Sequence, residues 1–305
     1  MINLILSIIC SSGNSLIMKL AERKTSNKSS LLLVNYVVAV FFGSMLVLRG
    51  SDAIGISQLG QVPVLAAING IFYVSTFLLL QLNIHKNGAT VSASLSHMGL
   101  MIPVLMSIFL FSEYPNAAQT AGVLIAIASL IVISVPGRVT GKTKSGSSPT
   151  YACCKAEENP SPPDTSASGY RWLLIPMLLC GGMADTMSKV FEAFCDHALE
   201  DIFLSLTFLA ALIICALVCL LRREKMNRFD VIYGLVLGLS NYLSTKFLIR
   251  AIYVIPAYMA YISYGLGVVI FVNLINLLFM HESLSRRDYI GMALAMSAIV
   301  LLNLS

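Results

Sequence analysis

The sequence predicts an all-α membrane protein in which ten transmembrane helices form two inverted five-helix repeats. Composition is the first reason: 57% of the 305 residues are apolar and only 11% are charged, more apolar surface than one soluble globule of this size can bury. The second reason is a set of ten apolar stretches of membrane-spanning length. The third is an internal repeat that relates the two halves of the chain.

Each stretch is long enough to cross the hydrocarbon core of a bilayer, which is roughly 30 Å thick and takes about 20 helical residues. The first stretch lacks the positive charges that open a secretory signal, so we expect it to remain as a span. In chain order the ten stretches cover residues 2–20, 30–48, 61–82, 89–111, 117–136, 172–191, 202–221, 231–249, 257–280 and 287–304.

The repeat is clearest in a glutamate that is followed nine residues later by a glycine and an apolar run. Glu113 and Gly122 match Glu282 and Gly291 at an offset of 169 residues, and the same offset lays "YVSTFLLLQL" on "YLSTKFLIRA". With five spans in each half, the second half must start from the opposite side of the membrane, so the repeats are expected to be inverted.

Small residues recur at matched places in the two halves and predict close helix packing. The fifth span carries Gly122 and Ala126, and the tenth carries Gly291 and Ala295. Gly234 and Gly238 show the same spacing in the eighth span. Small residues let helix backbones approach each other in lipid.

Residues 137–170 are rich in Ser, Gly, Pro and Thr and carry no apolar stripe, which is typical of a flexible linker. They separate a first five-helix repeat at 1–136 from a second at 171–305. Fifteen of the 20 lysines and arginines fall in loops after odd-numbered spans, whereas Arg49 and Arg250 fall in even ones. The positive-inside bias therefore predicts a multi-pass protein of the cell inner (plasma) membrane with both termini outside.

The sequence argues against an enzyme. It has no His-Glu-x-x-His pattern, no phosphate-binding glycine loop and no nucleophile paired with a base, and its seven cysteines follow neither a disulfide nor a zinc spacing. We expect no cofactor or metal, and a small-molecule substrate and membrane lipid as partners rather than nucleic acid. The protein is expected to be a monomer or homodimer, and a receptor or scaffold remains an alternative class.

Ionisable residues inside spans are costly and are the first candidates for a transport pathway. Lys246 stands out because its repeat partner is Phe77, while the Tyr, Ser and Thr before it occur in both halves. We expect it either to contact an anionic group of the substrate or to form a structural pair with Asp185. Asp185 shares a helix face with Lys189 and is, with His97, a candidate for proton coupling.

Polar and aromatic side chains gather in the third, fourth, eighth and ninth spans, as expected of a pocket for a small polar solute with an apolar body. The predicted substrate-binding residues, besides Lys246, are Asn69, Tyr73, Thr76, Ser92, Ser96, Asn241, Tyr242, Thr245, Tyr258 and Tyr261.

Two segments resemble a known family. The stretch from "AIYVIPAYMAYISYGLG" to "IGMALAMSAIVLLN" is similar to the last two helices of the small multidrug resistance family, and "SSGNSLIMKLAE", which contains Lys19, resembles its first helix. The doubled ten-span chain resembles the EamA-like branch of the drug/metabolite transporter superfamily. That resemblance implies alternating-access transport of small metabolites, often amino acids, through a cavity lined by the third, fourth, eighth and ninth helices.

The chain departs from the small multidrug family at its coupling residue. Where that family carries a membrane-embedded glutamate, this chain has Ser11 and Gly181; Asp185, one turn farther along, is the carboxylate that could replace it. The EamA-like branch usually keeps both termini in the cytoplasm, opposite to the charge count above. The leading hypothesis is a secondary exporter or exchanger of an amino acid or other carboxylate-bearing solute. The alternative is a proton-coupled exporter of cationic apolar drugs that uses Asp185.

Overall fold

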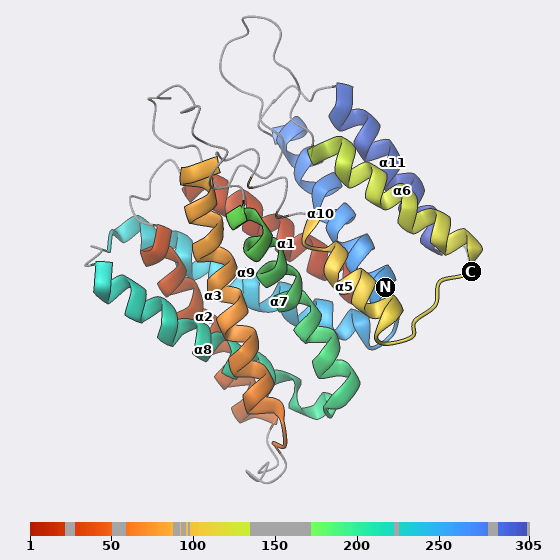
Figure 1. Cartoon of the computed structure of the whole chain (residues 1–305). Helices are drawn as coiled ribbons and strands as arrows, with labels where there is room; N and C mark the ends of the chain where they lie inside the picture. The colour runs from red at the N-terminus through yellow and green to blue at the C-terminus, as the bar shows by residue number, and fades with distance from the viewer. Residues whose placement is uncertain are drawn as a thin grey trace, which may run out of the picture. The chain divides into compact units, whose positions relative to one another are not determined.

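The computed structural model describes residues 1–21, 28–50, 59–87, 92, 96, 98–134, 172–222, 226–279 and 286–303. Regular structure in these residues is entirely helical (Figure 1). The α-helices are α1 (Ile2–Ala21), α2 (Lys28–Gly50), α3 (Val62–Asn87), α5 (Met101–Phe109), α6 (Ala117–Ser134), α7 (Leu174–Phe194), α8 (Glu200–Arg222), α9 (Arg228–Ile252), α10 (Ala257–Phe279) and α11 (Arg286–Asn303), and the 3₁₀ helix η3 (His197–Leu199) precedes α8.

Among the described residues, seven helical segments are long and apolar enough to cross a membrane. They are α1, α2, α3, α7, η3 with α8, α9 and α10. α6 is apolar but shorter, and α11 opens with the charged residues Arg286, Arg287 and Asp288. The fourth predicted span is described only in part, as α5 and single residues before it. The all-helical prediction is therefore confirmed for the described residues, as is the presence of several helices of membrane-spanning length.

The chain divides into two compact units that take helices from both predicted repeats. Unit 1 comprises Met1–Phe77 and Met183–Ile255, and unit 2 comprises Leu78–Gly182 and Pro256–Ser305. The linker 137–170 lies outside the described residues. Each unit therefore combines helices of the first half with helices of the second half.

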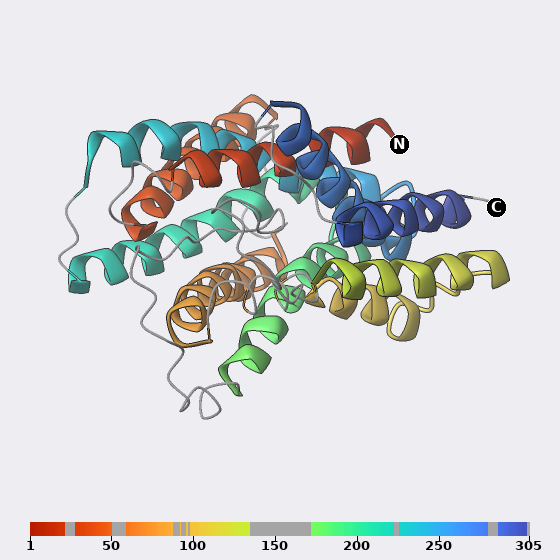
Figure 2. The ribbon, with the colours of Figure 1, turned by 90° about the horizontal axis from the view of Figure 1, so that it is seen from above.

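In unit 2, α6 and α11 lie side by side and antiparallel (Figure 2). A Cβ placed on Gly122 would lie 3.1 Å from Cγ of Leu302, and one on Gly291 would collide with the side chain of Ile133. Ser129 Oγ donates a 2.8 Å hydrogen bond to the carbonyl of Gly291. The close packing predicted from the matched small residues is confirmed, since Gly291 lies where Ile133 leaves no room for a side chain and Gly122 lies in tight contact with Leu302.

Two further pairs of matched helices are antiparallel. The start of α10 meets the end of α5, where the Tyr258 amide donates to Ser107 Oγ at 3.0 Å, and Gly265 faces Leu100 at the other end of the pair. In unit 1, Gly43 of α2 faces Ser205 near the start of α8. Farther along α8, Cys215 Sγ donates to the carbonyl of Ser29 at 3.7 Å, near the start of α2.

Glu113, the glutamate of the first repeat motif, caps the N-terminus of α10. Its carboxylate accepts a 2.6 Å hydrogen bond from the amide of Ala257, the first residue of that helix, and another from the hydroxyl of Ser107. The first amides of a helix lack intrahelical acceptors and attract negative charge. Glu282, its repeat partner, lies outside the described residues.

α9 is the central helix of unit 1. Its small residues face α2: a Cβ on Gly234 would lie 2.6 Å from Cβ of Val34, and one on Gly238 would lie 2.5 Å from the carbonyl oxygen of Asn35. Its serine face meets α1, where Ser240 Oγ donates to the carbonyl of Cys10 at 2.8 Å. Because α1 and α2 pack against two faces of α9, the rotation of α9 about its axis is fixed. The direction of its third face, which carries Lys246, is fixed with it.

Candidate functional site

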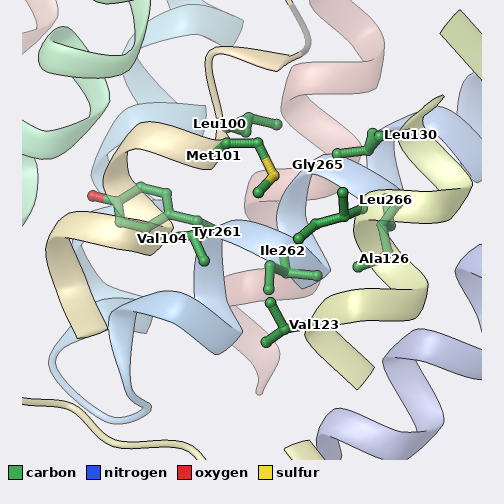
Figure 3. A pocket seen from close by; sticks show the side chains of 11 residues that line it. Leu100, Met101, Val104, Val123, Ala126, Leu130, Tyr261, Ile262, Gly265 and Leu266 are labelled. Atoms are coloured by element: carbon green, nitrogen blue, oxygen red, sulfur yellow. The ribbon is translucent and has the colours of Figure 1, made fainter. Parts of the chain in front are cut away.

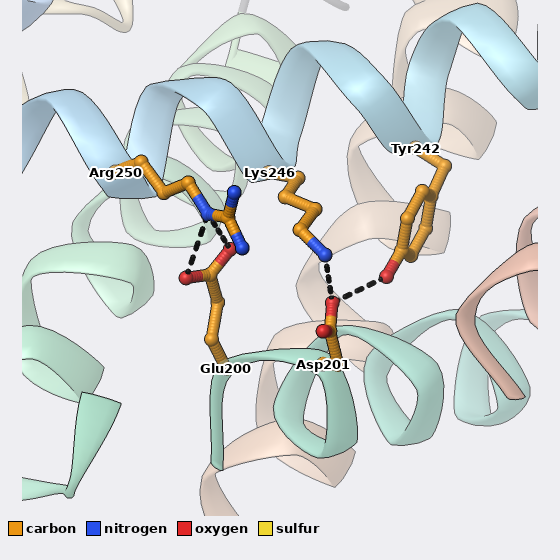
Figure 4. A network of polar contacts seen from close by, with 5 residues as sticks. All are labelled: Glu200, Asp201, Tyr242, Lys246 and Arg250. Atoms are coloured by element: carbon orange, nitrogen blue, oxygen red, sulfur yellow. Dashed lines mark hydrogen bonds and ion pairs between the residues drawn. The ribbon is translucent and has the colours of Figure 1, made fainter. Parts of the chain in front are cut away.

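Two ion pairs join the start of α8 to the last turns of α9 (Figure 4). Tyr242, Lys246 and Arg250 are spaced by four residues and therefore share one face of α9. The first turn of α8 presents Glu200 and Asp201 to this face. Lys246 pairs with Asp201, and Arg250 pairs with Glu200 at 3.2 Å.

Exposure differs across the two pairs. The side chain of Arg250 is 44% exposed and that of Glu200 only 7%, whereas Lys246 is 8% exposed and Asp201 27%. An isolated charge at the position of Lys246 would carry a large desolvation cost, so its pairing with a carboxylate is a condition for burying it as an ammonium. The four charges cancel, and the cluster can hold a charged ligand only by exchanging partners.

Asp201 is the residue on which the cluster converges. Its carboxylate accepts hydrogen bonds from Nζ of Lys246 and, at 2.8 Å, from the hydroxyl of Tyr242. The expected alternative partner of Lys246, Asp185, is not the one that the structure shows: among the described residues Lys246 pairs with Asp201. The predicted seventh span began at residue 202, which placed Asp201 outside the membrane, but α8 begins at Glu200 after the turn of η3.

An aromatic cluster surrounds the buried ring of Phe208, two turns beyond Asp201 on α8. The centroid of the Phe208 ring lies 6.4 Å from the ring centroid of Tyr36, 5.8 Å from that of Tyr73 and 6.1 Å from that of Tyr242. Aromatic pairs at these separations are favourable beyond the area that they bury. The cluster gives the charged site an apolar wall built from α2, α3, α8 and α9.

Tyr73 and Thr245, both predicted site residues, are brought together. The Tyr73 hydroxyl lies 3.3 Å from Oγ1 of Thr245, and Thr245 also donates to the carbonyl of Asn241 at 3.1 Å. Lys246 follows Thr245 directly, and its Nζ lies 5.9 Å from the ring centroid of Tyr242. The structure therefore joins Tyr73, Tyr242, Thr245 and Lys246 in one part of unit 1.

Six residues of unit 1 carry buried side-chain atoms that have no hydrogen-bond partner within the described part of the chain. Oδ1 of Asn14, Oδ1 of Asp230 and the hydroxyl of Tyr253 are three such atoms, and the others are both side-chain atoms of Asn69, Oγ of Ser205 and Oγ1 of Thr207. Asn69 is 1% exposed. A buried amide without partners costs free energy, so these groups are available to hydrogen-bond a ligand. Ser205 lies one turn beyond Asp201, and both Ser205 and the Tyr242 ring face Gly43 of α2.

The remaining predicted residues have local partners or belong to unit 2. Thr76 donates to the carbonyl of Phe72 at 2.7 Å, and Asn241 donates to Oδ1 of Asn35 at 3.4 Å. The hydroxyl of Tyr258 donates to Gln119 at 2.9 Å within unit 2. Ser92 is buried and Ser96 half-buried in the same unit, while His97 lies outside the described residues.

Tyr261 borders a small apolar cavity of unit 2 (Figure 3). Side chains of α5, α6 and α10 converge there, among them Met101, Val123 and Leu266, and the Tyr261 hydroxyl points away from the other lining side chains. The cavity has an apolar lining and no charged group, so it offers no partner to the carboxylate of a solute.

Asp185, the proposed coupling residue of the alternative hypothesis, lies in the middle of α7 and is half-buried. Lys189, four residues later, forms an ion pair with Glu192 at 2.5 Å. No cluster of three metal-ligating side chains occurs among the described residues. The charge-paired cluster of α8 and α9 joins two ion pairs among the described residues of unit 1.

Two aromatic rings stack beside the Glu200–Arg250 pair. His197 is the first residue of η3 and Tyr253 directly follows α9, and their ring centroids lie 3.7 Å apart. Burial, followed by the negative charge of Glu200, raises the pKa of the Tyr253 hydroxyl. This hydroxyl consequently stays neutral at physiological pH, and the charge at this end comes from Glu200 and Arg250.

No protein-family model matches the chain. The chain is similar to an uncharacterized protein from Haemophilus influenzae, with 22% identity across 97% of this chain and 96% of that protein. It also resembles a protein of known crystal structure, with a TM-score of 0.71 and 15% identity across 99% of this chain and 96% of the other. A likeness at this identity shows a shared fold, so function has to be argued from the site.

Proposed function

We propose that the protein is a secondary transporter that exports or exchanges a small carboxylate-bearing metabolite, such as an amino acid, by alternating access. The single observation that carries the proposal is the Lys246–Asp201 pair, a buried ammonium and a partly exposed carboxylate within helices long enough to span a membrane. Intramembrane charges are costly and typically line the path of a solute or ion.

The arrangement of matched helices supports the same proposal. In three pairs, α2 with α8, α5 with α10 and α6 with α11, a helix of the first half packs antiparallel to its counterpart in the second half. An in-plane two-fold relation between inverted repeats would produce this pairing. This pairing accords with a chain of ten spans that resembles the EamA-like drug/metabolite transporters. We propose both the ten spans and this family, together with residence in the cell inner membrane.

The solute would be bound by three kinds of group. Lys246 supplies a positive charge for a carboxylate, Asn69, Ser205 and Thr207 supply hydrogen-bonding groups, and the cluster around Phe208 supplies an apolar wall. A pocket with few polar groups and an apolar lining is the usual form of a small-molecule site.

Counterflow in proteoliposomes tests the proposal. Vesicles loaded with an unlabelled carboxylate are diluted into a trace of the labelled compound, across a panel of amino acids and organic acids. We expect at least one anion to exchange in wild-type vesicles and its exchange to be lost in Lys246→Ala. Undiminished exchange of every active anion in that variant would show that Lys246 is not the anchor.

The drug-export alternative makes a different demand. It requires Asp185, in the middle of α7, to bind protons and cationic apolar compounds in turn. Efflux of a cationic dye driven by a pH gradient would then be abolished in Asp185→Asn and retained in Lys246→Ala. Unaltered dye efflux in Asp185→Asn would exclude the drug-export alternative.

A further inference from the structure

We propose that Asp201 competes with the solute's carboxylate for Lys246 and takes up a proton when the solute displaces it. The inference rests on the proposed function, because it takes Lys246 as the anchor of the solute. It adds Asp201 to the mechanism as a second residue, whose carboxylate opposes binding of the solute.

Competition follows from the geometry of the pair. The side chain of Lys246 is 8% exposed, and its ammonium is already bonded to Asp201. A solute carboxylate that reaches this ammonium therefore arrives beside a second carboxylate. Two carboxylates at one site repel each other strongly, and the usual outcome is that one of them binds a proton.

Charge balance identifies Asp201 as the proton acceptor. Before binding, Lys246 and Asp201 cancel; after binding, Lys246 and the solute carboxylate cancel, which leaves Asp201 without a cation. Arg250 is committed to Glu200 at 3.2 Å, so it is not free to compensate. An unpaired carboxylate that is partly buried beside the negative charge of Glu200 is unfavourable, and protonation removes the charge.

The other titratable groups near Asp201 do not offset this effect. Glu200 precedes it in the chain and adds negative charge, and Glu192 and Tyr253 lie at the same end of the unit. Tyr242 donates its hydroxyl to Asp201. Hydroxyl oxygens also accept hydrogen bonds, so Tyr242 can stay bonded to Asp201 in both protonation states.

Exposure provides the route for the proton. The Asp201 side chain is 27% exposed, more than three times as much as that of Lys246, so Asp201 is the more accessible member of the pair. The proton comes from water when the solute binds and returns to water when the solute leaves and the ion pair forms again. Solute and proton therefore cross the membrane in the same direction.

Proton uptake by the purified full-length protein tests the inference. Protein in detergent, in weak buffer with a pH indicator at pH 7, is mixed with lactate, L-glutamate or L-leucine, and binding is followed in parallel by thermal stabilisation. For a probe that binds, we expect about one proton taken up per bound molecule, and an affinity that falls up to tenfold for each unit of pH increase.

Two variants separate competition from a structural role. Asp201→Asn keeps a hydrogen-bonding side chain but removes the competing charge, so it should bind the same probe more tightly than wild type and take up no proton. Glu192→Gln removes a carboxylate that pairs with Lys189 instead, and it should retain the proton uptake of wild type.

The outcomes distinguish this inference from the function on which it rests. A probe that binds without proton uptake, with an affinity independent of pH, overturns the role of Asp201 and leaves the transporter proposal standing. Binding by Asp201→Asn that is weaker than wild type also overturns it. If no carboxylate binds at all, the proposed substrate class fails and the inference fails with it. The pH dependence of wild type decides the matter even if Asp201→Asn does not fold.

Discussion

Replacing Lys246 with methionine should destabilise the protein through the charge that it leaves behind. Methionine keeps an unbranched apolar stem of similar length, so the main loss is the ammonium that pairs with Asp201. Breaking a fully buried ion pair by removing one partner costs about 3–5 kcal/mol. Because Asp201 is 27% exposed and keeps the hydrogen bond from Tyr242, water and that bond offset part of the cost, and we expect about 2–3 kcal/mol.

Unfolding by SDS in mixed micelles measures this loss as a change in the free energy of unfolding. The double variant Lys246→Met/Asp201→Asn removes both charges, and since replacing a whole buried pair by neutral groups is often neutral or stabilising, it should recover to within about 1 kcal/mol of wild type. Arg49→Met, at an exposed position in the last turn of α2, is the matched control and should change stability by less than about 0.5 kcal/mol.

Recovery in the double variant is the decisive part of this experiment. If Lys246→Met and the double variant are equally unstable, the loss comes from packing of the lysine stem and not from an unpaired carboxylate. A Lys246→Met protein as stable as the Arg49→Met control would refute the ion pair itself.

Three further substitutions test the packing and the site. Gly291→Leu forces a side chain into Ile133 and should cost about 1–3 kcal/mol in the same unfolding assay, whereas Gly13→Ala, where the nearest atom is 3.4 Å away, should be tolerated. Glu113→Ala removes the cap of α10 and should cost about 1–3 kcal/mol; a wild-type melting temperature would contradict that role. Asn69→Leu removes two unpartnered buried atoms and should raise stability while it lowers counterflow, so lowered stability would show that the amide has a structural partner.

The helical class and the close packing of α6 with α11 were predictable because apolar runs and matched small residues are visible in the sequence. Apolar runs of spanning length located the helices, and the matched glycines of α6 and α11 indicated a contact that the structure confirms. The predicted seventh span, 202–221, starts two residues after the start of α8 at Glu200. Acidic residues in a first helical turn are favourable, and this signal, together with Asp196 as the cap of η3, could have extended the helix.

The partner of Lys246 could not be predicted in the same way. Asp185 was the nearest carboxylate inside a predicted span, but an ion pair between α8 and α9 depends on the rotation and register of two helices, which are set by their packing against α1 and α2. The repeat also concealed the role of Glu113, whose carboxylate caps a helix of the other half at Ala257. Such contacts between distant segments follow from tertiary packing and leave no periodic trace in the sequence.

Thiol labelling at position 245 tests the central claim, that a solute crosses the membrane past Lys246. Thr245 is buried beside Lys246 and opposite Tyr73, and Thr245→Cys in a background without other cysteines places a single reactive group there. In sealed vesicles we expect a membrane-impermeant thiol reagent to label it from either side, and a carboxylate that undergoes counterflow to slow the labelling from both. Labelling from one side only, or labelling that no transported solute slows, would contradict the carrier mechanism.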